Sequence, residues 1–157
     1  MVKLLENIGE KQGELDDWIF KAQNTTSQEK EKYNEMLVSK MNDQAAEIDK
    51  YVEDVNKDEL LDEQQPATYA LAELEKIKKK FDRTNGTIET YRVYEKTLGN
   101  EPMAIDIIKV FEKKFETRFT LWKNREDFGQ LKRKWYQEPF KDHDSEYILE
   151  QVRKYNV

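Results

Sequence analysis

Hydrophobic residues recur at three- and four-residue steps over most of the chain, which is the spacing of one face of an α-helix. In the first segment this pattern predicts a helix over residues 2–23. We expect a break after it, because Asn24–Ser27 favours side-chain bonding to the local backbone and Thr26 with Glu29 has capping-box spacing. A second helix is then predicted over 28–62. Its apolar stripe is Tyr33, Met36, Leu37, Met41, Ala45, Ile48, Val52 and Val55.

Proline and glycine divide the rest of the chain into three further helices. Pro66 is tolerated at the first turn of a helix, so it opens one, and the apolar spacing keeps its phase across Asn85-Gly86. The run from Gly99 to Pro102 is a stop-and-restart signal, and Pro139 ends the helix that follows. These helices are predicted over 66–98, 103–137 and 145–156. The pattern therefore predicts an all-α fold, an elongated bundle of about five long helices with coiled-coil-like seams.

Composition agrees with long helices and excludes several classes of protein. Five glycines and three prolines are too few for many short strands joined by tight turns. The absence of cysteine excludes a disulfide scaffold, a thiol nucleophile, an iron–sulfur cluster and cysteine-based zinc sites. No stretch approaches the roughly 18 uncharged apolar residues of a membrane-spanning helix, and none near the start reads as a secretory signal. We therefore expect neither membrane insertion nor secretion.

An ordered set of residues near the end of the chain carries a family resemblance. From Leu121 to Tyr155 the pattern is Leu-Trp, five residues, an aromatic, two residues, Leu, three residues, Trp, three residues, Pro-Phe, and then an acidic amphipathic helix. This pattern resembles the segment of dynein heavy chains in which the tail passes into the linker, the lever in front of the AAA+ ring. It is more similar to the axonemal heavy chains than to the cytoplasmic ones.

The resemblance implies a tail-type helical bundle over 1–98, and a neck with the start of a linker-type helical segment over 99–157. It implies a structural and mechanical role in a microtubule motor, linking tail to linker and contributing to dynein complex assembly and microtubule-based movement. The implied partners are adjoining parts of the same heavy chain, neighbouring heavy chains, and dynein intermediate or light chains. The implied location is the cytoskeleton, with the axoneme of a cilium or flagellum favoured and the cytoplasm as the alternative. ATP hydrolysis in this family belongs to the ring, downstream of such a segment.

The same stretch contains the residues to which we assign the mechanical role. Leu121, Phe128 and Trp135 stand at seven-residue intervals with Leu131 between them, which predicts a rigid aromatic seam between helices. Proline breaks the helix after this seam, and the next aromatic residue is expected to pack into the resulting corner. The full predicted seam and corner is Leu121, Trp122, Phe128, Leu131, Trp135, Pro139 and Phe140.

No residue set predicts catalysis, a cofactor or a metal ion. His143 is the only histidine, and the chain has no GxxxxGK[ST] loop for a nucleotide. Glu112 and Glu116 lie one turn apart with lysines between them, which is typical of a solvated helix face. Lysine clusters precede Phe81 and Trp135, but the net charge of −6 opposes nucleic-acid binding. We expect a segment that is not an enzyme, with neither nucleic acid nor membrane as a partner.

One alternative class of function stays open. A free-standing coiled-coil or spectrin-like scaffold protein would share the helical composition without any motor. Continuation of the gene into a linker and nucleotide-binding loops would separate the two. The last predicted helix is still running near Val157, with no cap and no glycine after it, so we expect the chain to be a piece of a longer one.

Overall fold

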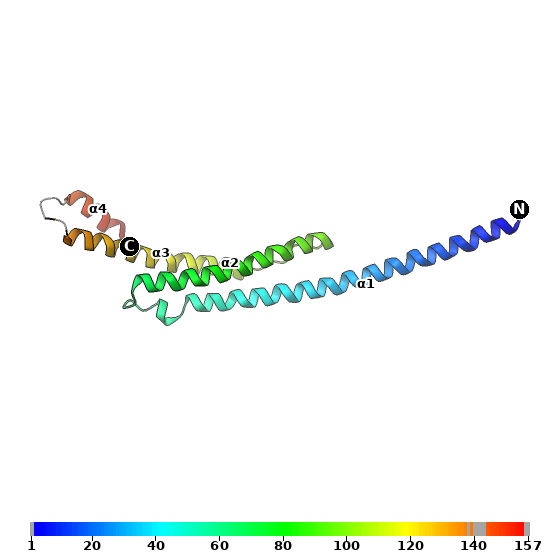
Figure 1. The fold of residues 1–157 in the computed structure, drawn as a ribbon, viewed down its shortest axis with the longest axis horizontal. Coiled ribbons are helices and arrows are strands. Elements are labelled where there is room, and N and C mark those ends of the chain that lie inside the picture. Colours follow the sequence, from blue (N-terminus) through cyan, green and yellow to red (C-terminus); the bar gives the residue numbers. More distant parts are fainter. Residues whose placement is uncertain (1, 138, 140–143, 156–157) are drawn as a thin grey trace. The chain divides into compact units, whose positions relative to one another are not determined.

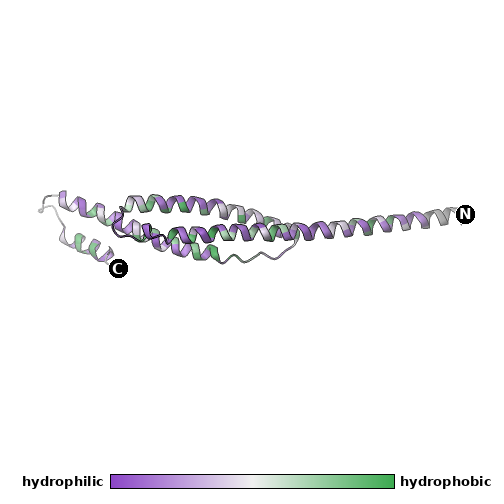
Figure 2. Cartoon of the chain, turned by 90° about the horizontal axis from the view of Figure 1, so that it is seen from below, coloured by the Kyte–Doolittle hydropathy of each residue, from purple (hydrophilic) through white to green (hydrophobic). Residues whose placement is uncertain are grey.

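The computed structural model describes residues 2–137, 139 and 144–155, with side chains described from residue 9 onward. Within these ranges every regular element is helical, as predicted, and no strand is present. Hydrophobic and hydrophilic residues are interleaved along the helices (Figure 2). The α-helices, labelled in Figure 1, are α1 (Val2–Val55), α2 (Ala67–Leu98), α3 (Ile107–Gln137) and α4 (Ser145–Tyr155). A short 3₁₀ turn, η1 (Asp58–Leu60), lies between α1 and α2.

The predicted break at residues 24–27 is wrong, because α1 is a single helix of 54 residues. The hydroxyl of Thr25 donates to the Lys21 carbonyl at 3.0 Å, and that of Thr26 to the Ala22 carbonyl at 2.8 Å. These bonds satisfy both hydroxyls inside the helix, so the side chains have no need to replace its backbone bonds. The described part of the chain therefore has four α-helices where the pattern predicted five.

Of the two helices that meet at the first interhelical turn, α2 begins close to its predicted limit and α1 ends well before its own. α1 stops at Val55, earlier than the predicted residue 62, and the chain makes the short turn η1 instead. Pro66 stands just before α2, and its carbonyl accepts the backbone N–H groups of Tyr69 and Ala70 at 3.0 and 3.1 Å. α2 then runs without interruption through Asn85-Gly86, as predicted.

Gly99 terminates α2 in the manner that the sequence predicts. Its φ of 75° is a left-handed value that glycine adopts without steric cost. The N–H of Gly99 donates to the Lys96 carbonyl at 3.1 Å, and the N–H of Asn100 to the Glu95 carbonyl at 2.9 Å. This pair of bonds is the Schellman arrangement, which satisfies carbonyls left free at the end of a helix.

The next helix begins later than predicted, at Ile107 instead of residue 103. The Glu95 carboxylate accepts the backbone N–H of Met103 at 3.0 Å, which holds the connecting segment against the end of α2. Glu95 is itself buried, and its second carboxylate oxygen has no hydrogen-bond partner among the described residues. α3 begins after this contact, at Ile107.

The chain forms two compact units, and α1 and α2 each contribute to both. Unit 1 comprises Met1–Asp43 and Ile88–Met103, and unit 2 comprises Gln44–Thr87 and Ala104–Val157. The domain boundary predicted at residues 98 and 99 therefore falls within unit 1. In unit 1 the buried face of α1 includes Leu37 and Met41, and the Asn100 amide donates to the Asn34 side-chain oxygen at 2.8 Å.

Unit 2 has a core shared by α1, α2 and α3. The hydroxyls of Tyr51 and Thr84 hydrogen-bond at 3.2 Å inside it, which satisfies two polar groups that α1 and α2 bury. The rings of Phe81 on α2 and Phe111 on α3 are stacked with centroids 4.1 Å apart. The fully buried side chains of this unit include Ile48, Val55, Leu74, Phe81 and Phe111.

Candidate functional site

A tryptophan of the predicted seam anchors α3 in unit 2. Trp122 is only 3% exposed, and its indole Nε1 donates to the Leu60 carbonyl at 3.1 Å. Leu60 is also buried and belongs to η1, the turn between α1 and α2. A buried carbonyl needs a donor, and the indole N–H needs an acceptor, so this single bond satisfies both groups. It ties the turn to α3.

An apolar groove opens beside this anchor, with a volume of about 710 Å³. The guanidinium of Arg125 lies over the Trp122 ring, 5.0 Å from its centroid. Arg118 and Glu63 also line the groove, so charged groups of both signs border an aromatic and aliphatic surface. The groove is lined by Leu60, Leu61, Glu63, Arg118, Leu121, Trp122, Asn124, Arg125, Phe128, Val152 and Tyr155.

Phe128 is the residue of the predicted seam that joins two helices. Its ring meets the Trp135 ring edge-on with centroids 6.2 Å apart, within α3. It also lies 5.8 Å from the ring centroid of Tyr155 on α4. The aromatic contact between α3 and α4 is therefore made by Phe128 and Tyr155. Tyr155 was not assigned to the seam from sequence, although it lies in the helix predicted over 145–156.

The other members of the predicted seam and corner are placed differently. Leu121 is 56% exposed and lines the groove together with Phe128. Leu131 and Trp135 are half-buried, and Pro139 is exposed. Phe140, the predicted corner residue, lies outside the residues that the structure describes. The corner itself thus stays a prediction.

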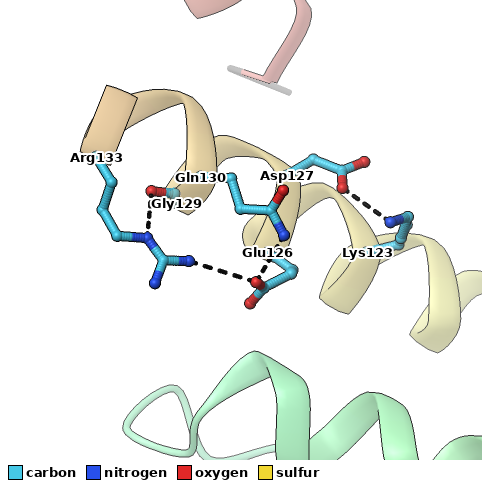
Figure 3. Close-up of polar contacts among 6 residues, drawn as sticks. All are labelled: Lys123, Glu126, Asp127, Gly129, Gln130 and Arg133. Atoms are coloured by element: carbon cyan, nitrogen blue, oxygen red, sulfur yellow. Dashed lines mark hydrogen bonds and ion pairs between the residues drawn. The ribbon is translucent and has the colours of Figure 1, made fainter. Parts of the chain in front are cut away.

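Polar contacts on the far part of α3 form a network within that helix (Figure 3). Lys123 pairs with Asp127 at 2.9 Å, and this hydrogen bond raises the pKa of the lysine above its ordinary value. Glu126 accepts from Gln130 at 2.9 Å and from the Arg133 guanidinium at 3.4 Å. These pairs are four and seven residues apart on one helix. They support the helix and present no acid–base pair to a pocket.

The described residues include no group of three or more histidine, cysteine, aspartate or glutamate side chains placed to hold a metal ion. His143 lies outside the described residues. Glu112 and Glu116 are both exposed on α3, as expected for a solvated face. None of the described helices is long and apolar enough to cross a membrane.

Comparison with the models of known protein families, with curated proteins and with solved structures found no match for this chain.

Proposed function

We propose that this chain is a structural segment without catalysis of its own, and that it forms the tail-to-linker junction of a dynein heavy chain. The proposal combines the residue pattern of 121–155 with the helix contacts in that stretch. Its mechanical part is that α3 and α4 act as two connected rods, so that displacement of one is transmitted to the other.

The observation that carries the proposal is the contact between Phe128 on α3 and Tyr155 on α4. Aromatic rings at this separation contribute about 0.5–1.5 kcal/mol beyond the area that they bury. The two rings also line the groove beside Trp122, together with Val152 of α4. A helix pair held by stiff rings near a buried anchor can keep a defined angle, which is what a force-transmitting junction requires.

A test of the mechanics compares Phe128→Ala with Tyr136→Ala in the complete heavy chain. Tyr136 is a matched aromatic control on the same helix, because its side chain is 81% exposed. We expect Phe128→Ala to leave ATP turnover near normal, since the ring is unchanged, and to slow microtubule gliding by tail-anchored motors. Tyr136→Ala should change neither quantity. Equal loss of turnover and gliding in Phe128→Ala would refute the coupling role.

A free-standing spectrin-like or coiled-coil scaffold is the second candidate, and one observation favours it. In unit 2, Tyr51 of α1 bonds Thr84 of α2, and Phe81 of α2 stacks on Phe111 of α3, which is how helices pack in a three-helix bundle. Sequencing the parent transcript separates the two candidates. A linker and nucleotide-binding loops after Val157 would support the dynein proposal, and a stop codon at that point would leave the scaffold.

A further inference from the structure

The first half of α1 carries large apolar side chains that contact no other described helix. Every described residue from 9 to 33 is exposed. The hydrogen bond from the Asn100 side chain to the Asn34 side chain marks where the chain after α2 meets α1. Trp18 is 72% exposed, and Leu15 and Ile19 are also open to solvent. This part of α1 lacks the main source of helix stability in proteins, which is the packing of an apolar face against other elements. A partner for this face would supply the missing stability.

The exposed residues form one continuous coiled-coil frame. With Gln12, Ile19, Thr26 and Tyr33 at the a positions, the d positions are Leu15, Ala22, Glu29 and Met36. We call the apolar members of this frame the α1 stripe: Leu15, Ile19, Ala22, Tyr33 and Met36. Leu15, Ile19, Tyr33 and Met36 are all prominent among the exposed hydrophobic residues of the chain.

The α1 stripe overlaps in direction with the face of α1 that is already packed. At 100° per residue, Ile19 points in the same direction as the buried Leu37, and Leu15 and Tyr33 point about 40° from it. The stripe therefore extends the packed side of α1 into the part of the helix whose described residues are all exposed. In unit 1 the stripe runs into a groove of about 310 Å³ between α1 and α2. That groove is lined by Tyr33, Met36, Leu37, Lys40, Tyr94, Thr97 and Leu98.

We propose that the α1 stripe binds a second copy of this chain, with the two α1 helices parallel and in register. Two features of the frame are self-complementary in that arrangement alone. Gln12 occupies an a position, where its amide meets the Gln12 amide of the other copy and can both donate and accept. Lys11 at a g position faces Asp16 at the e position of the other copy, twice per dimer, with opposite charges. Lys11 exchanges its exposed contact with Glu14 for this pairing.

Glu29 limits the strength of the dimer. It occupies a d position, so the two copies place their carboxylates face to face, and each is only partly compensated by Lys32 of its own chain at 3.7 Å. Glu29→Leu should therefore tighten the dimer, because it replaces a like-charge contact by an apolar one. A rise in the dissociation constant of this variant contradicts the proposed frame.

Sedimentation equilibrium of the complete chain at about 100 µM tests the association, since a dimer of micromolar affinity is largely formed at that concentration. Ile19→Ser should raise the dissociation constant about tenfold or more, because each copy loses a buried a-position side chain. Phe20→Ser is the matched control: Phe20 is the next residue and is also exposed, but it lies outside the stripe. A monomeric parent chain, or equal effects of the two variants, overturns the proposal.

The absence of native cysteine makes orientation measurable as well. Ala22→Cys places one thiol at a d position in each copy, within disulfide reach of its counterpart in a parallel, in-register dimer. We expect rapid cross-linking under mild oxidation, and slow cross-linking of Phe20→Cys. A dimer in which Ala22→Cys does not cross-link overturns the parallel register. These experiments measure self-association only, so their failure is distinguishable from failure of the proposed role at the tail-to-linker junction.

Discussion

Trp122→Ala removes both a buried ring and a buried hydrogen-bond donor from unit 2. Truncation of a buried tryptophan to alanine costs about 3–5 kcal/mol of unfolding free energy, because it opens a cavity and loses the transfer energy of the ring. Trp122→Phe keeps most of the ring packing but leaves the Leu60 carbonyl without its donor. An unsatisfied buried acceptor costs about 1–3 kcal/mol, so the phenylalanine variant should fall between the parent and the alanine variant.

Urea unfolding followed by far-ultraviolet circular dichroism measures these differences. Trp18→Ala is the matched control, because Trp18 is the most exposed tryptophan of the chain and its loss should change the unfolding free energy by less than about 0.5 kcal/mol. Trp135→Ala, at a half-buried site, should lie between the two alanine variants. The reasoning is refuted if Trp122→Ala and Trp18→Ala have the same unfolding free energy, or if Trp122→Phe matches the parent.

Three further predictions concern backbone, pH and nucleotide. Gly99→Ala should destabilise the chain by about 1–2 kcal/mol, because the backbone at Gly99 has a left-handed φ. Gly129→Ala should stabilise the chain by about 1 kcal/mol, because Gly129 lies inside a helix with open space around an added Cβ. Urea midpoints check both variants. The Lys50 ammonium holds the pKa of Glu47 below its ordinary value, and the Glu47 carboxylate holds the pKa of Lys50 above its own. The small stabilisation from this exposed pair should therefore be constant near neutral pH, fall as acid protonates Glu47 and fall as base deprotonates Lys50; urea midpoints of the parent and Lys50→Met across pH check this. Calorimetry with millimolar ATP should detect no saturable binding, and such binding would reveal a site that the sequence did not indicate.

Helix content and most helix ends could be predicted, because they depend on local chemistry. Glycine at a left-handed position and proline before a first turn act within a few residues, and both ends of α2 lie where Pro66 and Gly99 place them. The break at residues 24–27 was mispredicted for a local reason as well. Threonine hydroxyls can cap a new helix or bond back to the preceding turn, and in α1 they bond back. Spacing alone does not distinguish the two arrangements.

Contacts between distant segments could not be predicted, because they depend on which helices meet. The segment before α3 is held by the Glu95 carboxylate, which accepts the Met103 N–H from eight residues further along the chain, and the helical spacing does not show this contact. The anchor of α3 likewise depends on a backbone carbonyl of η1, a group that has no signature in the sequence.

Helix geometry divides the predicted seam residues of α3 between two faces. Neighbouring residues on a helix point about 100° apart, so Leu121 and Trp122 cannot both face the same core. Trp122 lies 11 residues after Phe111, and on an α-helix this spacing brings two side chains to within about 20° of the same direction. Phe111 is the residue that stacks on Phe81. Trp122 therefore belongs to the face of α3 that packs in the core of unit 2.

Phe128 points about 120° away from Trp122 on the same helix, and there it meets Tyr155 of α4. α3 thus has two apolar faces: the seven-residue spacing from Leu121 to Phe128 follows the face that meets α4, and Trp122 belongs to the other. One face holds α3 in the core and the other holds α4. For this reason substitutions at Trp122 should act on the unfolding of unit 2, whereas substitutions at Phe128 should release α4 while the core stays folded.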